Sequence, residues 1–166
     1  MPCNWKASLL SKCVLDIQPY NTIQTDVTWE TCTLRSWLNK DFYQSAFNAT
    51  EKNKIQITNV KNDDNPEAGT PGGNDTEDKI FLLSIGEAQQ YFSSNSERIC
   101  CPTQYAKDKG CRTDNKGACS WVLRSPGVFR DFVSIVHADG NIYYFNDYSF
   151  AVKFNCGVRP ALWISP

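Results

Sequence analysis

The residue type used most often for acid–base catalysis occurs once in this sequence. His137 is the only histidine, so Ser-His-Asp or Cys-His catalysis would depend on that position, and a site of several metal-bound histidines is excluded. His137 stands before the turn sequence Ala138-Asp139-Gly140, and no nucleophile motif accompanies it. We therefore interpret His137 as an exposed turn residue and expect no catalytic residue.

The eight cysteines are the second candidates for chemistry. They form no C-x-x-C pair, and the adjacent cysteines at positions 100 and 101 cannot easily reach one tetrahedral ion together, so zinc is not expected. Unpaired cysteine behaves as a small apolar residue, which favours free and mostly buried thiols. Disulfides between Cys111 and Cys119, or between Cys3 and Cys13, remain the alternative.

Carboxylates gather in one polar segment, where Asp63, Asp64, Asp75 and Asp78 offer the oxygen ligands that calcium prefers. Their spacing fits no EF-hand, and a solvated loop explains them better. The sequence also lacks the motifs of dinucleotide-binding, P-loop and zinc-protease sites. We expect neither a metal nor a cofactor.

The charge balance argues against nucleic acid as a partner. Lys and Arg number 17 against 18 Asp and Glu, whereas a phosphate backbone demands a basic face. Hydrophobic residues make up 41% of the 166 residues, enough for the core of a single domain over residues 1–166. No apolar run approaches the ~20 residues of a membrane span, and the N-terminus lacks the apolar stretch of a secretory signal. We expect no membrane insertion and assign no location.

The first half of the chain contains one strong helix signal. Thr33 is in position to cap a helix over residues 34–47, whose apolar stripe should face the core. Residues 61–78 hold many turn formers and almost no apolar residues, which predicts a long exposed loop within the domain. The stripe consists of Leu34, Trp37, Leu38, Phe42 and Ala46; the other expected elements are strands at 9–10, 13–15 and 55–60, a loop over 16–28 and a helical turn at 50–54.

The second half is dominated by strand signals. A buried strand over 79–83 leads to Ser84 and Glu87, whose spacing is that of a capping box for a helix over 85–92. The Asp-Gly pair at 139–140 between apolar runs predicts a hairpin. Helices in the N-terminal half and an antiparallel strand cluster in the C-terminal half predict an α+β domain. The remaining elements expected are a helical turn at 102–107 and strands at 121–124, 132–137, 141–145 and 158–164.

Several motifs occur together along the chain. They are C-T-L-R-S-W-L-N at 32–39, K-I-F-L-L-S at 79–84, W-V-L-R-S-P-G at 121–127 and G-V-R-P-A-L-W at 157–163. Their combination, over about residues 7–165, resembles a bacterial and phage domain family that includes the variable proteins of diversity-generating retroelements. The resemblance implies a C-type lectin fold, in its formylglycine-generating-enzyme-like branch, with a variable ligand-binding region at 128–156.

The residue types in 128–156 agree with that implication. Retroelements of this kind copy template adenines to random bases, mainly in asparagine codons, and such changes cannot produce Lys, Glu, Gln, Met or Trp. In the stretches 128–137 and 141–156, Lys153 alone falls outside the permitted set, whereas Glu77 to Trp121 uses Lys, Glu, Gln and Trp repeatedly. Strands also disfavour Lys and Glu, so an ordinary strand region is the alternative explanation of this pattern.

Aromatic residues are dense in the same region and do not alternate strictly, so some must point outward or lie on a loop. Rings flanked by Asn, Asp and Ser have the composition of a paratope, although an aromatic-rich core hairpin is the alternative. The expected ligand-binding residues are Val128, Phe129, Arg130, Asp131, Phe132, Ser134, His137, Ile142, Tyr143, Tyr144, Phe145, Asp147, Tyr148, Phe150 and Phe154.

Arg124 and Arg159, flanked by Trp121 and Trp163, stand at the ends of this region. We interpret the tryptophans as packing residues and the arginines as groups that fix loop carbonyls or carboxylates. The sequence thus predicts a non-catalytic protein that binds a protein or a surface glycan. The alternatives are an oxidase related to the formylglycine-generating branch, which would use cysteine thiols, and a structural phage or cell-surface module without a diversified site.

Overall fold

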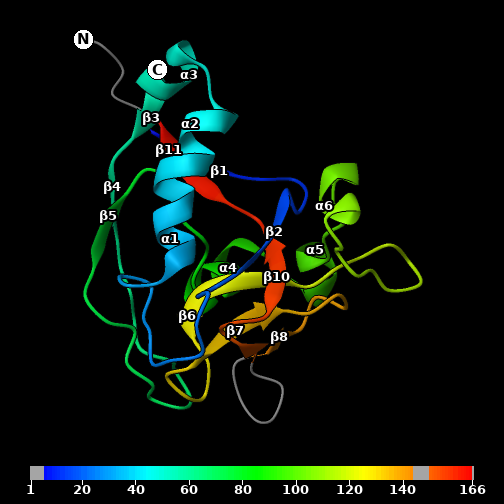
Figure 1. The fold of residues 1–166 in the computed structure, drawn as a ribbon. Helices are drawn as coiled ribbons and strands as arrows, with labels where there is room; N and C mark the ends of the chain where they lie inside the picture. The colour runs from blue at the N-terminus through cyan, green and yellow to red at the C-terminus, as the bar shows by residue number, and fades with distance from the viewer. Residues whose placement is uncertain (1–5, 144–149, 166) are drawn as a thin grey trace.

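The computed structural model describes residues 6–143 and 150–165, and its largest sheet carries the C-terminal region (Figure 1). The strand order is β2-β10-β6-β7-β8, and β9 also pairs with β7. The strand β6 is buried along its whole length, as expected of a central strand. The strands of this sheet are β2 (Asp16–Pro19), β6 (Trp121–Pro126), β7 (Phe132–Val136), β8 (Ile142–Tyr143), β9 (Phe150–Ala151) and β10 (Asn155–Val158).

Two smaller sheets complete the strand structure of the described residues. One joins the first and last strands, β1 (Ala7–Leu10) and β11 (Ala161–Ile164), and adds β3 (Ile55–Gln56). The other pairs β4 (Thr58–Val60) with β5 (Thr76–Asp78). Helices and antiparallel pairs therefore confirm the α+β class, although strands from the N-terminal half enter the sheets as well.

The helix expected at 34–47 forms, but with a π-helical turn inside it. It consists of α1 (Thr33–Trp37), η1 (Leu38–Phe42) and α2 (Tyr43–Ala46). The Tyr43 N–H donates to Leu38 O, five residues back, and this wider turn moves the buried stripe by one residue. Leu34 and Leu38 are buried as expected and Tyr43 joins them, whereas Ala46 is exposed.

The cap of this helix also differs from the expectation. Cys32 is the N-cap residue and its thiol accepts a hydrogen bond from the Arg35 N–H at 3.4 Å, so the assignment of Thr33 as cap was wrong. The predicted capping box of Ser84 and Glu87 is confirmed. The other helices are α3 (Ala49–Lys54), α4 (Ile85–Tyr91), α5 (Asn95–Arg98) and α6 (Gln104–Asp108).

Some strand predictions need correction. Asp16–Pro19, expected to be loop, is the edge strand β2; Pro19 ends it, a position where a missing N–H is tolerated. Residues 13–15 form no strand, and Val14 makes only an isolated bridge to Pro102. Residues 80–83 are buried as expected, but Phe81 alone pairs, through a bridge to Ala161.

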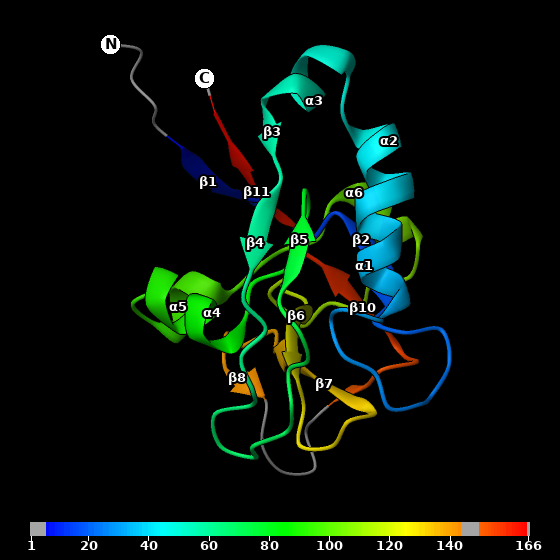
Figure 2. The same cartoon turned by 90° about the vertical axis from the view of Figure 1, so that its left-hand side faces the viewer.

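The helices lie around the sheets rather than in one layer. Figure 2 shows α4 and α5 on the opposite side of the molecule from the column of α1, η1 and α2. Within the described residues, none of the helices combines the length and apolarity that crossing a bilayer requires. The buried side chains with the largest volumes include Trp29, Trp121, Leu34 and Leu38, which place the core between the helix column and the large sheet.

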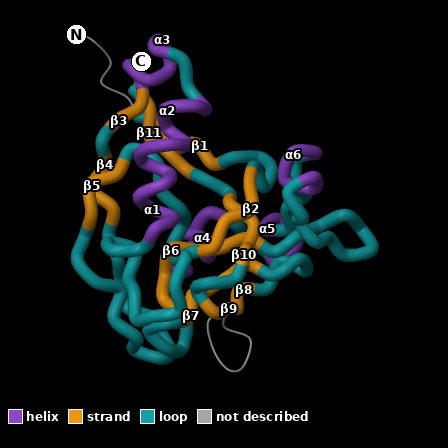
Figure 3. The backbone as a smooth tube through the Cα atoms, viewed as in Figure 1, coloured by secondary structure: helices purple, strands orange, loops and turns teal. Residues whose placement is uncertain are grey.

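The loop over 61–78 is less exposed than its composition predicts. Its last residues form β5, and Asn65 and Thr70 are buried. The Asn65 side chain donates to Pro126 O at 3.0 Å and the Thr70 hydroxyl donates to Val128 O at 2.8 Å. Figure 3 shows this loop running beside the turn between β6 and β7. The polar segment therefore supports the start of region 128–156 through Asn65 and Thr70, while most of its other residues are exposed as expected.

Candidate functional site

The strand β7 and the short strands β8 and β9 carry five of the expected ligand-binding residues: Phe132, Ser134, Ile142, Tyr143 and Phe150. The strand β7 pairs with β9 at its start and with β8 at its end, so both short strands lie along the same edge. Phe150 is opposite Val133 and Tyr143 is opposite Ile135, which places both rings on the core-facing side of β7, where they are half-buried. The fold thus brings together residues from 129 to 154 that are separated in the sequence.

Rings along this edge meet in edge-to-face pairs. Phe129 and Phe132 have centroids 5.9 Å apart, and so have Phe150 and Phe154. His137 and Tyr143 are 5.1 Å apart. Phe129 is 62% exposed and Phe154 is 54% exposed. Phe132 alternates with Val133 and so lies on the other side of β7 from Phe150 and Tyr143. We call the six residues of these three separate pairs, on both sides of the β7 edge, the aromatic face: Phe129, Phe132, His137, Tyr143, Phe150 and Phe154.

One expected ligand-binding residue is excluded by its burial. Ser134 has no exposed surface, and its hydroxyl donates to Pro126 O at 2.7 Å across the β6–β7 pair. It was wrongly included because both faces of β7 are covered at this point: Val133 and Ile135, on the face opposite to Ser134, are buried as well. Ser134 therefore holds the β6–β7 pair together.

The other expected residues lie at the surface or outside the described chain. Arg130 is exposed, while Val128, Asp131 and Ile142 are half-buried. The Asp131 carboxylate accepts a hydrogen bond from the Gln24 side chain at 2.8 Å. Tyr144, Phe145, Asp147 and Tyr148 lie outside the described residues.

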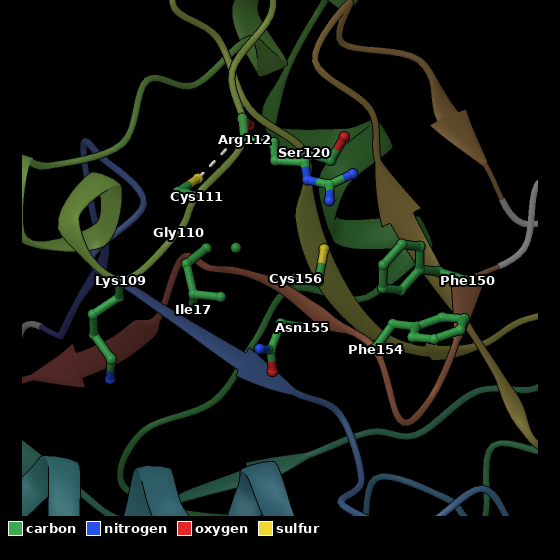
Figure 4. Close-up of a pocket in the computed structure, with 11 residues that line it drawn as sticks. Ile17, Lys109, Gly110, Cys111, Arg112, Ser120, Phe150, Phe154, Asn155 and Cys156 are labelled. Atoms are coloured by element: carbon green, nitrogen blue, oxygen red, sulfur yellow. Dashed lines mark hydrogen bonds between the residues drawn. The ribbon is translucent and has the colours of Figure 1, made fainter.

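A pocket of about 620 Å³ opens beside the aromatic face (Figure 4). We call it the β9–β10 pocket, because Phe150, Phe154 and Cys156 form one wall. The opposite wall is the segment after α6, with Gly110, Cys111 and Arg112, which sequence reasoning did not connect with this region. In the sequence, β6, β7 and β8 separate this segment from β9 and β10, and the segment carries no motif. Only the fold could therefore reveal that it lies beside Phe150 and Phe154.

The basic residues of the β9–β10 pocket differ in their partners. Lys109 turns away from the pocket and forms an ion pair with Asp16 at 2.8 Å, and this hydrogen bond raises the pKa of Lys109. Arg112 is exposed and forms no ion pair with a described residue. Its guanidinium extends over Cys156 towards Phe150 in Figure 4. The pocket therefore holds an uncompensated positive charge beside two rings.

The thiols around the pocket are poor nucleophiles. Cys111, Cys119 and Cys156 are free, as expected for most of the cysteines, and no described pair of cysteines is bridged. Burial raises the pKa of Cys156 to about 12, and burial also raises the pKa of Cys111 and of Cys119. Because the thiolate is the reactive form, these side chains are protonated and inert at neutral pH.

The remaining candidates for chemistry are occupied by structural contacts. The His137 ring is exposed and lies 3.1 Å from the Asp139 carboxylate. Asp78 is buried and accepts hydrogen bonds from Trp29, Arg35 and Thr76. Among the described residues, no group of three or more His, Cys, Asp and Glu side chains could hold a metal ion.

The two arginines of the motifs fix the frame behind the aromatic face. Arg124 is buried; it donates to Lys61 O at 2.8 Å and to Leu82 O at 2.7 Å, and it forms an ion pair with Glu87. Arg159 donates to Ser11 O at 2.9 Å. We call the network of Arg124, Arg159 and the groups they contact the arginine frame.

Aromatic rings complete the arginine frame around Arg159. Its guanidinium lies 4.9 Å from the centroid of the buried Trp121 ring and 5.3 Å from that of Phe92, within the range of cation–π attraction. Trp163, expected to pack likewise, is only half-buried and pairs with Ser8 and Gln56 through its backbone. Its packing role is therefore smaller than that of Trp121.

Comparison with known proteins gives a family but no activity. The chain matches no curated protein, and it matches no solved structure. A family described as "Domain of unknown function (DUF6273)" matches residues 4–166. Because this match spans nearly the whole sequence, the chain belongs to the DUF6273 family.

Proposed function

We propose that this domain is a non-catalytic ligand-binding protein, and that the aromatic face binds a protein or a surface glycan. The observation that carries the proposal is the set of ring pairs along the edge of β7, in which Phe129 and Phe154 expose more than half of their surface. Clustered exposed rings are costly to hydrate and are enriched at binding hot spots.

The support behind these rings favours binding further. The side chains of Asn65 and Thr70 hold the main chain of the turn between β6 and β7. Arg124, in β6, ties that strand to the neighbouring segment by donating to Leu82 O. A face whose backbone is already ordered loses less entropy when a ligand docks. The arginine frame and the polar loop thus supply rigidity, while the rings supply contact area.

We also propose that residues 128–156 are diversified by a retroelement, as the resemblance of the motifs implies. Apart from Lys153, the residue types of this region are permitted ones, and positions such as Phe129, Arg130 and Phe154 are exposed. Substitution at such positions changes the surface with little effect on the core. A variable face on a constant frame is therefore compatible with the fold.

An oxidase function that uses cysteine thiols is less well supported than ligand binding. Cysteine oxidases need a thiolate or a metal-bound thiol, whereas burial raises the pKa of Cys156 and of Cys119. The rings of the aromatic face need no such activation. Protonated thiols in the wall of the pocket act as apolar surface.

The test is binding of the labelled domain to arrays of glycans and of peptides. The Phe129→Ser and Phe154→Ser variants, singly and together, should lose at least about tenfold in affinity for the features bound by the parent protein, because buried rings dominate interface energies. Ile57→Ser is the matched control, since Ile57 is also 62% exposed but lies on the link between β3 and β4. Equal binding by the ring variants and the control would refute the proposal.

A further inference from the structure

We infer that the β9–β10 pocket binds a carboxylate joined by a short linker to an aromatic ring. This inference rests on the proposed function and names a ligand class for one part of the binding surface. The ligand could be a free aromatic acid or the C-terminal aromatic residue of a peptide, because both present the same carboxylate and ring.

The size and walls of the pocket suit a small aromatic group. A volume of about 620 Å³ lies within the range of ordinary small-ligand sites. Phe150 and Phe154 form a wall of two rings at an interplanar angle of 70°, and Phe154 keeps 54% of its surface exposed. A third ring can therefore stack against Phe154 or meet the edge of Phe150.

The charge of the pocket selects an anion. Its lining contains Lys109 and Arg112 but no Asp or Glu. Asp16 already compensates Lys109, so the charge of Arg112 is the one available to a ligand. A planar guanidinium binds a carboxylate through paired hydrogen bonds, which are stronger than those between neutral groups.

Neutral polar groups of the lining can complete the contacts. The Ser120 hydroxyl and the Asn155 side-chain amide line the pocket, and neither makes a hydrogen bond to another described residue. The pKa of Cys156 is raised to about 12 by burial, so its thiol carries no charge that would repel an anion. The pocket thus offers donors beside Arg112 and no competing negative charge.

Gly157 in the lining makes a tight packing contact. A Cβ atom on Gly157 would lie 2.4 Å from Ser120 O, so glycine is required where β10 passes Ser120. A ligand ring that packs on Phe150 and Phe154 faces Arg112 across the pocket, so we expect its carboxylate to point towards Arg112. This geometry predicts that both the ring and the carboxylate contribute to affinity.

The test titrates the full chain with phenylacetate and with its neutral analogue phenylacetamide, by calorimetry or by ligand-observed NMR. Phenylacetate should bind at least about tenfold more tightly than phenylacetamide. Arg112→Gln should remove this preference, and Phe154→Ser should weaken both probes. Lys116→Gln is the matched control, because Lys116 is an exposed cation on the same segment but does not line the pocket.

A second pair of probes distinguishes the two sources of the ligand. N-acetylphenylalanine and its amide present the end of a peptide chain, and tighter binding of N-acetylphenylalanine than of phenylacetate identifies a C-terminus as the source. Weaker binding identifies a free acid.

Two results would overturn the inference: phenylacetamide binding as well as phenylacetate, or no binding of phenylacetate up to about 20 mM, the range in which such small fragments still bind. If Phe129→Ser still abolishes array binding in that case, the proposed function stands without this ligand class.

Discussion

The arginine frame and the aromatic face use their large side chains in opposite ways. In the frame, Arg124 is 3% exposed, and its guanidinium donates hydrogen bonds to two carbonyls and forms an ion pair with a carboxylate. In the face, Phe129 is 62% exposed and contacts a neighbouring ring. Burial with full hydrogen bonding makes a residue indispensable to folding, whereas exposure leaves it free for another role. The contrast predicts that stability and binding reside in different residues.

Replacing Arg124 should have the largest effect on stability. Arg124→Ala would leave Lys61 O, Leu82 O and the Glu87 carboxylate without their donor, at a cost of about 3–5 kcal/mol in the free energy of unfolding. Urea denaturation measures this loss. The control is Arg130→Ala, which removes an exposed arginine next to Phe129 and should change the free energy of unfolding by no more than about 0.5 kcal/mol. Similar losses in both variants would remove the distinction between frame and face.

The hairpin between β7 and β8 separates His137 from Tyr143, two residues of the aromatic face. Gly140 has a φ of 83°, and its carbonyl accepts a hydrogen bond from Arg98 at 2.8 Å. A Cβ atom there would lie 1.8 Å from Asn95 O, so Gly140→Ala should cost about 2–3 kcal/mol through backbone strain and displacement of α5. Thermal unfolding followed by circular dichroism tests this. Gly117→Ala is the control, because Gly117 also has a positive φ, 84°, but no atom lies within 4 Å of the position that its Cβ would take. This variant should lose less stability than Gly140→Ala. Equal losses would mean that the Asn95 contact is unimportant.

The sequence predicted this hairpin because Asp-Gly is a local signal, and it predicted the capping box of α4 for the same reason. It did not predict the π-turn at Leu38, the strand β2 or the burial of Asn65, which depend on tertiary contacts. Composition predicted that residues 61–78 are exposed, and most of them are, but the Asn65 and Thr70 side chains are buried and donate to Pro126 O and Val128 O.

The residues of the candidate site also fall into those that the sequence revealed and those that only the fold revealed. Phe129 and Phe154 were recognised because aromatic density is visible in a sequence. Arg112 was missed, because its place in the pocket depends on how the segment after α6 crosses β10. Ser134 was included wrongly, because other elements cover both faces of β7 there, and composition does not reveal such tertiary packing.

The buried Cys156 thiol in the wall of the β9–β10 pocket should make the stability of the fold depend on alkaline pH. Burial raises the pKa of Cys156 from an ordinary value of 9.0 to about 12, so the folded state holds its proton more tightly than the unfolded state. Stability from this thiol is fully present below pH 9 and is lost as pH rises towards 12, by about 1.4 kcal/mol per pH unit. Denaturation between pH 8 and about 10.5 should show a shallower decline in Cys156→Ala than in the parent chain. An unchanged decline would place the thiol in contact with solvent.

The smallest change in stability is expected for the exposed rings. Phe129→Ser and Phe154→Ser should each lower the free energy of unfolding by no more than about 1 kcal/mol, because most of each ring is already in water. Urea denaturation beside the Ile57→Ser control measures the difference. Losses above about 3 kcal/mol in the free energy of unfolding, typical of a buried ring, would assign these residues to the core. The proposed difference between the aromatic face and the arginine frame would then be wrong.

The coding DNA tests the central claim, a variable binding face on a constant frame, most directly. Sequencing the DNA beside the gene should reveal a reverse-transcriptase gene and a near-repeat of the codons for 121–160, whose mismatches fall at adenines of the repeat and cluster in codons 128–156. The codons for Trp121, Arg124 and Arg159 should match between the copies. A fully sequenced neighbourhood with no such repeat, or with mismatches spread evenly over frame and face, would contradict the account.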